Sequence, residues 1–313
     1  MKICIFGGSG SFGTAMSKYL MENTSDEVIV FDRNEKMQFE HRQKLGSERI
    51  HYIIGDIRDK DAVYNALESV EYVILASAMK HIDKCESNPD ECRKTNIDGC
   101  INVINASIER GVKKVVFLST DKATNPTTLY GCSKLFVEMY CQCVDNKNTE
   151  IIRTRYGNVF GSNGSVAWVF DKLAREKKSL TVTNPDMTRF FMSLSEAVDL
   201  VWYALNHGSH GDLWVYNNKS CTIEELAKLF SDDYNVVGNR CVEKTDEALL
   251  TVSELQHSDF IEDKYFRVND NIENDYGYIR PFQSDSAERL TREELENMLN
   301  DWRKYNGIRE YTR

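Results

Sequence analysis

The sequence predicts an α/β fold organised around a doubly wound parallel sheet, and three observations support this prediction. Short apolar runs alternate with helical patterns from residue 2 to residue 155. The runs are almost continuously apolar, as is typical of strands that are covered on both faces of a sheet. A glycine-rich turn joins the first strand to the first helix. Together these features are typical of a Rossmann-type sheet.

The elements of this first part follow one another in a regular order. Residues 2–6 predict a buried strand because the run is apolar and ends in glycines. Further strands are expected at residues 27–31, 51–54, 72–75, 115–118 and 151–154. Helices are expected at residues 14–23, 60–67, 92–110 and 133–144, where apolar residues recur at helical spacing.

The alternation becomes less regular after residue 155. Residues 157–164 form a loop rich in glycine and asparagine, and helices are expected at residues 166–176, 196–205, 224–230 and 292–302. Thr291 is a suitable N-cap for the last of these helices. We therefore expect a first domain over residues 1–155, to which later segments return, and a smaller portion over residues 156–313.

Composition excludes several classes of protein. The chain has 313 residues, of which 41% are hydrophobic, so it can bury a substantial core. Acidic residues outnumber basic ones by 49 to 39 without a long block of one sign, so neither nucleic acid nor a membrane is an expected partner. The first apolar run is too short for a signal peptide or a membrane span, and we expect a cytoplasmic protein. The nine cysteines are scattered, and we expect no metal site.

The glycine-rich turn predicts a dinucleotide site. Glycines stand at positions 7, 10 and 13, directly after the first strand and at the start of the first helix. Small residues there let the backbone approach a pyrophosphate, which then lies at the helix N-terminus. The expected cofactor contacts in this turn are Gly7, Ser9, Gly10, Ser11, Phe12 and Gly13. A glycine turn without a ligand is the alternative.

The end of the second strand carries two signals for the adenine ribose that disagree. Arg33, with Lys36 nearby, favours the 2′-phosphate of NADP, whereas the Asp32 carboxylate favours the free 2′-hydroxyl of NAD. We expect NADP, and Asp32 keeps NAD open. Further cofactor contacts are expected at Asp56 and Ile57 beside the adenine, at Ala76, Ser77 and Ala78 where the fourth strand ends, and at Asn96, whose amide could instead satisfy backbone groups.

A dense group of reactive side chains follows the fifth strand. Tyr130 and Lys134 lie one helical turn apart, so the ammonium can sit close enough to lower the pKa of the phenol. A solvated helix face can carry such a pair by chance. The glycine turn favours a catalytic role for the pair. A dinucleotide bound there would accept hydride from an alcohol while the phenol takes the alcohol's proton.

Several segments resemble those of a known family. They are Gly55-Asp-Ile-Arg-Asp59, Ala78-Met-Lys-His-Ile82, Cys85-Glu-Ser-Asn-Pro89, Lys94-Thr-Asn-Ile97, Ser119-Thr-Asp-Lys-Ala123, Arg155-Tyr-Gly-Asn-Val159 and Met187-Thr-Arg-Phe190. In order and spacing the chain resembles the UDP-N-acetylglucosamine 4,6-dehydratase family, C5-inverting type, from about residue 3 to residue 255. This family is a branch of the extended short-chain dehydrogenase/reductase superfamily.

The resemblance implies roles for the reactive side chains. Tyr130 takes the C4 hydroxyl proton while hydride leaves, Lys134 binds the nicotinamide ribose, and Thr120 bonds the C4 oxygen. Lys122 is the implied base at C5 and Asp121 the implied acid at C6. A lysine base needs a pKa well below its usual range, and we expect burial, or Lys80 and Lys134 as neighbouring cations, to lower it.

The resemblance also implies a substrate, UDP-N-acetylglucosamine or a related UDP-sugar, and a homo-oligomer, either a dimer or a hexamer. The implied substrate contacts are Lys80, Asn158, Val166, Thr181, Thr183, Arg240 and Glu243, whereas Arg189 is expected to tie loops together. The chain departs from the family where Cys241 and Val242 replace Pro and Gly, and where Asp32 stands before Arg33 in place of the usual serine.

Two alternatives remain open at this point. A UDP-sugar 4-epimerase needs only the Tyr130 and Lys134 pair, and it usually has small hydroxyl residues where this chain has Asp121 and Lys122. A non-catalytic NAD(P)-binding interaction protein on the same fold would be expected to lack the tyrosine or the lysine. The dipeptide Asp121-Lys122 therefore favours the dehydratase.

Overall fold

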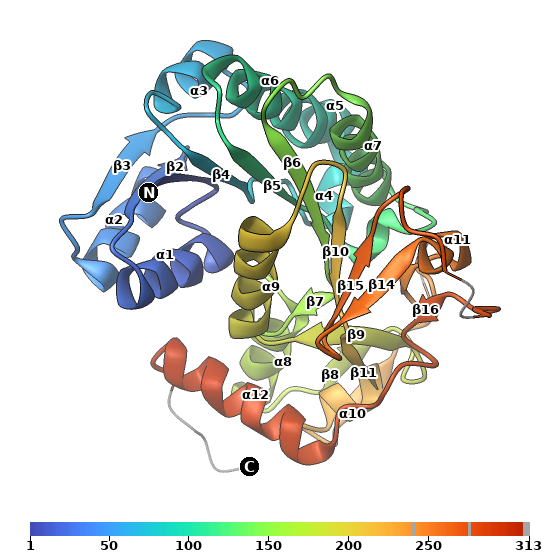
Figure 1. Cartoon of the computed structure of the whole chain (residues 1–313). Coiled ribbons are helices and arrows are strands. Elements are labelled where there is room, and N and C mark those ends of the chain that lie inside the picture. Colours follow the sequence, from blue (N-terminus) through green and yellow to red (C-terminus); the bar gives the residue numbers. More distant parts are fainter. Residues whose placement is uncertain (240–241, 275–276, 309–313) are drawn as a thin grey trace.

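A nine-stranded sheet forms the centre of the molecule. The computed structural model describes residues 1–239, 242–274 and 277–308 (Figure 1). Seven strands are parallel, in the order β10 (Leu213–Tyr216), β6 (Glu150–Arg155), β5 (Lys114–Leu118), β4 (Tyr72–Leu75), β1 (Lys2–Phe6), β2 (Glu27–Asp32) and β3 (Ile50–Ile54). The antiparallel strands β15 (Tyr265–Val268) and β14 (Ser258–Ile261) extend the sheet beyond β10.

Helices cover both faces of this sheet (Figure 1). On one face, Cys4 and Phe6 pack with α3 (Lys60–Ala66), α6 (Cys100–Arg110) and α7 (Leu129–Cys143). On the other, Ile3 and Ile5 pack with α1 (Ser11–Asn23) and α9 (Leu194–His207). Alternate residues of one strand therefore enter two separate cores, because successive side chains of a strand point to opposite faces. This confirms the predicted doubly wound sheet.

The remaining elements lie mostly beyond residue 155, at the carboxyl ends of the parallel strands. They include a three-stranded sheet of β11 (Lys219–Thr222), β9 (Thr188–Met192) and β7 (Asn158–Val159), and two pairs, β12 (Tyr234–Val236) with β8 (Leu180–Val182) and β13 (Ala248–Leu250) with β16 (Phe282–Gln283). Helices α8 (Val166–Arg175), α10 (Ile223–Ala227), α11 (Val252–Gln256) and α12 (Arg292–Tyr305) accompany them.

The structure corrects several predicted helix boundaries. The helix expected at 92–110 is three pieces, namely α5 (Pro89–Arg93), a π-helical segment (Lys94–Gly99) and α6. Helix α7 begins before residue 133 because Thr128 caps it, accepting a hydrogen bond from Gly131 N. Among the described residues, three α-helices were not predicted: α2 (Glu35–Leu45), α4 (Ile82–Ser87) and α11. Thr291 caps α12 in a capping box with Glu294, as predicted.

Later segments of the chain return to the central sheet. Strand β10 pairs with β6, and β15 and β14 continue from it, so residues 213–268 supply the edge of a sheet that begins at residue 2. Within the described residues, none of the helices is long and apolar enough to cross a membrane.

Candidate active site

A cavity of about 960 Å³ lies at the carboxyl ends of the parallel strands. One half is lined by loops that follow β1, β2, β4 and β5, and the other by residues of β7, α8, β8 and β9. Ligands of open parallel sheets bind in this position, outside the carboxyl ends of the strands. The cavity therefore brings the two parts of the chain to one site.

The glycine turn forms a close backbone cradle at the start of α1. Gly7 has φ +80°, and a Cβ at this position would lie 2.9 Å from Ser77 N. A Cβ at Gly13 would lie 2.4 Å from the carbonyl oxygen of Gly8. Only glycine fits both places, and the resulting backbone suits a pyrophosphate at the N-terminus of α1. The residues present therefore fit a dinucleotide.

Most of the predicted cofactor contacts line this half of the cavity. They are Gly7, Gly10, Ser11, Phe12, Gly13, Asp32, Arg33, Asp56, Ile57, Ala76, Ser77 and Ala78. Ser9 is instead buried beside the cavity, and its hydroxyl makes no hydrogen bond within the described residues. Lys36 is 84% exposed on α2 and lies 3.8 Å from Glu40, so it does not reach the lining.

Opposite charges meet where the adenosine end of a dinucleotide would lie. Asp32 Oδ1 accepts a hydrogen bond from Asn34 N at 3.0 Å. The Arg33 guanidinium lies 3.5 Å from Asp56 Oδ2. Burial raises the pKa of Asp56, but its hydrogen bonds with Arg58 outweigh this effect and hold the pKa below the usual range. Arg33 therefore already faces a carboxylate.

Asn96 does not contact the cavity, which corrects its predicted role as a cofactor ligand. It is fully buried in the π-helical segment, where its Oδ1 accepts a hydrogen bond from Met79 N at 2.7 Å. Its amide donates to Met79 O and to Ser133 Oγ. Asn96 thus fixes the backbone that follows β4 against α7, the helix that carries Tyr130.

Tyr130 and Lys134 lie in the first turns of α7, and both line the cavity. Lys134 Nζ donates a hydrogen bond to Leu118 O at 2.7 Å and lies over the Phe117 ring. Burial raises the pKa of the Tyr130 phenol, and hydrogen bonding with Thr120 opposes this rise. The predicted lowering by Lys134 is therefore wrong for the protein alone, because burial dominates the environment of the phenol.

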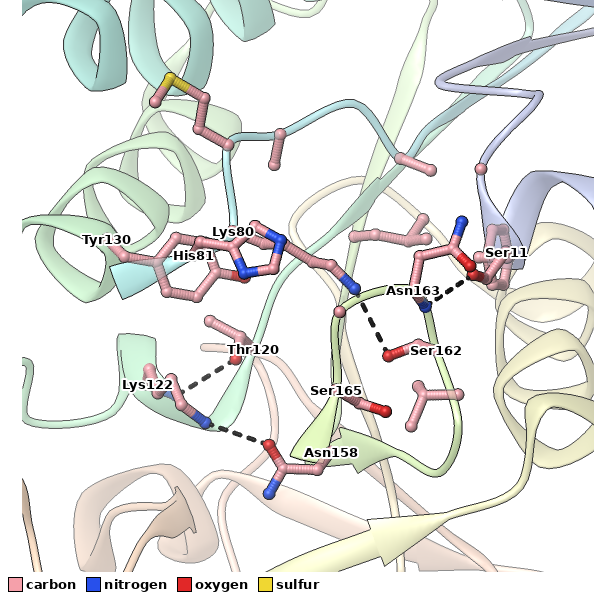
Figure 2. A pocket seen from close by; sticks show the side chains of 18 of the residues that line it. Ser11, Lys80, His81, Thr120, Lys122, Tyr130, Asn158, Ser162, Asn163 and Ser165 are labelled. Atoms are coloured by element: carbon pink, nitrogen blue, oxygen red, sulfur yellow. Dashed lines mark hydrogen bonds between the residues drawn. The ribbon is translucent and has the colours of Figure 1, made fainter. Parts of the chain in front are cut away.

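Asp121 and Lys122 form a short 3₁₀ turn directly after β5. Asp121 is fully buried, and its Oδ1 accepts hydrogen bonds from Thr120 Oγ1 and from Lys122 Nζ, each at 2.9 Å. Its Oδ2 is buried and makes no hydrogen bond within the described residues. Lys122 lines the cavity and also donates to Asn158 Oδ1 at 3.4 Å, as Figure 2 shows. The pair is part of the site and not a surface turn.

The expected lowering of the Lys122 pKa is wrong. Burial does lower it, but the carboxylates of Asp121 and Glu247 outweigh burial and raise the pKa above its usual range. The two cations proposed as neighbours bond to other groups. Lys80 Nζ donates to Ser162 Oγ (Figure 2), and Lys134 Nζ donates to Leu118 O. Lys122 is therefore an ammonium ion held by carboxylates.

Helix α7 and the Asp121 turn are packed against each other without spare room. A Cβ at Gly131 would lie 2.2 Å from the carbonyl oxygen of Lys122. Glycine at this position therefore sets the separation between the tyrosine helix and the acid–base pair. Thr120 stands between them, with hydrogen bonds to Tyr130 and to Asp121.

The predicted substrate contacts occupy the other half of the cavity. Those on its lining are Lys80, Asn158, Val166, Thr181, Thr183 and Glu243. Arg189 also reaches the lining, but its guanidinium donates to three backbone carbonyls, at Thr188, Lys244 and Thr245, as expected of a residue that ties loops together. Arg240 and Cys241 lie outside the described residues.

A segment that the sequence indicated only as a loop crosses between the two halves. Asn163 N donates to Ser11 Oγ at 2.9 Å, and Ser162 Oγ accepts from Lys80 Nζ at 3.4 Å (Figure 2). Residues 160–165 therefore join the glycine turn to the substrate half. Sequence reasoning also missed Glu247, which no local motif distinguishes from a surface glutamate.

A protein-family model matches most of the chain. The model of a family described as polysaccharide biosynthesis protein matches residues 3–269. The chain belongs to the polysaccharide biosynthesis protein family.

Relatives with two different activities resemble this chain. A UDP-N-acetylglucosamine 4,6-dehydratase (inverting) from Campylobacter jejuni strain 81-176 is 40% identical over 86% of this chain and 83% of its own length. A UDP-glucose 4-epimerase from Rickettsia rickettsii is 36% identical over 95% of this chain and 94% of its own.

Solved structures share the architecture of this family member. Pen from Bacillus thuringiensis superposes with a TM-score of 0.89 at 31% identity, covering 96% of this chain and 97% of that one. A dTDP-glucose 4,6-dehydratase from Streptomyces venezuelae has a TM-score of 0.74 at 18% identity and covers 98% of each chain. The latter likeness concerns the fold alone.

Proposed function

We propose that this protein is an NAD(P)-dependent dehydratase that removes water from UDP-N-acetylglucosamine across C5 and C6 and inverts C5. The observation that carries the proposal is that Lys122, which lines the same cavity as Tyr130 and Lys134, contacts the buried carboxylate of Asp121. This arrangement offers an acid and a base beside an alcohol-oxidising pair. The inverting dehydratases of Campylobacter support the assignment at about 40% identity.

The first stage is oxidation at C4. Tyr130 accepts the C4 hydroxyl proton, and Lys134 holds the nicotinamide ribose. NAD(P), when bound, would supply the hydride acceptor for this oxidation and the hydride donor for the later reduction at C6. The ketone at C4 then acidifies the hydrogen on C5.

The second stage is elimination, and the Asp121–Lys122 pair can supply both groups that it needs. Movement of one proton over the 2.9 Å from Lys122 Nζ to Asp121 Oδ1 converts the ion pair into a neutral amine and a carboxylic acid. The amine takes the C5 proton, a C5–C6 double bond forms, and the C6–O bond breaks. Asp121 protonates the departing hydroxyl, which leaves as water, and the ion pair is restored.

The last stage returns a proton to C5. After hydride addition to C6, an enolate spans C4 and C5, and Tyr130 still carries the proton that came from the C4 hydroxyl. Return of that proton to the face opposite Lys122 inverts C5 and regenerates the phenolate. In this scheme the proton that ends on C5 comes from an exchangeable hydroxyl, and the original C5 proton passes through Lys122 and Asp121 to water.

The assay that tests the function incubates the purified protein with UDP-N-acetylglucosamine in deuterated water. We expect mass spectrometry to show the loss of one water and NMR to show deuterium at C5. An isomer of unchanged mass would contradict the dehydratase and favour 4-epimerisation, the activity of the Rickettsia relatives. Nuclear Overhauser contacts in the product report the configuration at C5.

For the cofactor, we propose NAD in place of the NADP that the sequence favours. Three contacts support this revision. Asp32 lines the cavity, Arg33 already faces Asp56, and Lys36 is not part of the lining. A 2′-phosphate would meet two carboxylates there, whereas a 2′-hydroxyl can donate to Asp32. Chromatography of the cofactor released from the denatured protein distinguishes the two, and NADP in that extract would contradict the revision.

We also retain the homo-oligomer, dimer or hexamer, as a proposal that rests on the family resemblance. Sedimentation velocity of the purified chain tests it, and a monomer at micromolar concentration would exclude both assemblies.

A further inference from the structure

A second, smaller cavity of about 140 Å³ lies behind Lys122. Most of the residues that line it are polar or charged. Among the described residues, four border both cavities: Lys122, Asn158, Arg189 and Glu243. These four residues form a wall between the sugar cavity and the smaller one. Lys122 therefore has a second face, and the groups on that face act on the same amine that the reaction uses.

Glu247 occupies this second face. It is 5% exposed, and its Oε1 lies 3.9 Å from Lys122 Nζ. It borders the smaller cavity, and the lining of the larger cavity does not include it. Lys122 Nζ thus has two carboxylates within 4 Å, Asp121 Oδ1 at 2.9 Å and Glu247 Oε1 at 3.9 Å, and of these two residues only Glu247 borders the smaller cavity.

The Glu247 carboxylate is held firmly by its surroundings. Its backbone N donates to the Ser284 hydroxyl at 3.0 Å, and Ser284 N donates to the Glu247 carbonyl at 2.8 Å. Lys244 Nζ donates to Glu247 Oε2 at 3.3 Å and to Thr124 O at 2.9 Å. The carboxylate is therefore preorganised, and Lys244 partly balances its charge.

We infer that Glu247 is a positioning residue for the elimination, which holds the Lys122 amine together with Asp121 and keeps it basic toward C5. This inference rests on the proposed dehydratase activity. The charged groups around the amine are Asp121 in its own turn, Glu247 before β13 and Arg189 in β9, and the two carboxylates outweigh the guanidinium. After the shared proton moves to Asp121, Glu247 is the anion that remains beside the free amine.

The role explains why two carboxylates surround one lysine. Asp121 must become an acid to expel the hydroxyl, so its negative charge is lost at the moment when Lys122 must act as a base. An anion that stays charged through this step makes the amine a stronger base. Lys244 Nζ, 3.3 Å from Glu247 Oε2, holds this carboxylate in place.

The experiment compares the wild-type enzyme with Glu247→Gln, which keeps the shape of the side chain and removes its charge. Oxidation at C4 and elimination are separable, because a variant slow only in elimination accumulates reduced cofactor, seen by its near-ultraviolet absorbance. For Glu247→Gln we expect kcat for dehydration to fall about tenfold or more, KM for the UDP-sugar to stay within about twofold, and reduced cofactor to accumulate. We also expect the alkaline limb of the pH–rate profile to move to lower pH, since Lys122 loses one of its two carboxylates.

Asp246→Asn is the matched control. It removes a carboxylate from the neighbouring position, where Asp246 accepts a hydrogen bond from Thr188 Oγ1, and asparagine can still accept that bond. We expect wild-type kinetics from this variant. Unchanged turnover by Glu247→Gln, or lost turnover without reduced cofactor, overturns the inference. Because wild-type enzyme is assayed in parallel, failure of the dehydratase proposal itself is seen separately as the absence of water loss.

Discussion

At the scale of single residues, the charge on Lys122 decides which chemistry the site can perform. An isolated lysine in this place would need a lowered pKa to act as a base, yet the carboxylates of Asp121 and Glu247 raise it. In the proposed mechanism the pair resolves this difficulty, because acid and base arise together when one proton crosses the 2.9 Å from Lys122 Nζ to Asp121 Oδ1. Neither group then has to titrate against solvent during the reaction.

The first prediction separates oxidation from elimination. Lys122→Ala removes the base but leaves Tyr130 and Lys134 in place, so we expect dehydration to fall by about a hundredfold or more. Bound cofactor should still become reduced when the UDP-sugar is added. Tyr130→Phe is the matched control, since it should abolish both water loss and cofactor reduction. Normal turnover by Lys122→Ala would show that the base is another group.

The second prediction concerns pH and a histidine away from the cavity. His41 is 2% exposed, its Nδ1 lies 2.8 Å from the Tyr52 hydroxyl, and burial lowers its pKa to about 4. As the pH falls below about 6.5, this histidine takes up a proton in the unfolded chain but not in the folded protein. The free energy of unfolding therefore decreases until the pH reaches about 4, where the folded protein also takes up the proton. We expect this residue to account for up to about 3 kcal/mol of that loss.

Urea unfolding between pH 4 and pH 7 measures this effect. His41→Gln cannot take up a proton, so the dependence of its unfolding free energy on pH should be shallower over this range. If the unfolding free energy of the variant depends on pH as steeply as that of the wild type, groups other than His41 cause the pH dependence.

At the scale of elements, the sequence predicted the parallel strands well because each is a short apolar run with a turn after it. It predicted α7 less well. The apolar pattern begins at residue 133, whereas the cap at Thr128 starts the helix early enough to include Tyr130 in its first turn. A helix boundary set by one hydrogen bond is hard to see in a hydrophobic pattern.

The third prediction follows from that cap. Thr128→Ala removes the side chain that accepts from Gly131 N, so we expect a loss of about 1 kcal/mol in the free energy of unfolding. Because the first turn carries Tyr130, kcat should fall as well. Thr291→Ala is the control: it removes the cap of α12 at a similar cost in stability and should leave kcat unchanged. Equal kinetic effects of the two variants would contradict this account.

At the scale of the whole molecule, contacts between segments that are far apart in the sequence could not be predicted. Nothing local to residues 213–216 or 258–268 indicates that they extend a sheet begun at residue 2. Glu247 and Lys122 are likewise far apart in the chain, so the second carboxylate beside the lysine could not be predicted. The cofactor cradle was predictable because all of its glycines lie within one turn.

The fourth prediction concerns a buried ion pair that joins three elements. Arg155 in β6 pairs with Glu138 in α7 and with Glu254 in α11, and both Arg155 and Glu138 are almost fully buried. Glu138→Ala leaves a buried guanidinium short of a partner, so we expect a loss of about 3–5 kcal/mol. Glu254→Ala should cost less, because this carboxylate is 26% exposed.

Chemical denaturation followed by circular dichroism and by tryptophan fluorescence measures both variants. Since the C-terminal strands lie in the central sheet, we expect the two signals to change together in one transition. Two separate transitions would show that the parts of the chain unfold independently.

The close contact at Gly131 has a consequence for how long the ketone intermediate stays in one pose. The tyrosine helix and the Asp121 turn are fixed at one separation. In the proposed reaction, the groups that oxidise the sugar and those that dehydrate it therefore act on neighbouring carbons of a ring that does not move between the two stages. In an epimerase, by contrast, the keto-sugar must rotate within the site so that its other face receives the returning hydride. A larger residue at position 131 would separate the two sets of groups, and the oxidised sugar would then be free to leave or rotate before it loses water.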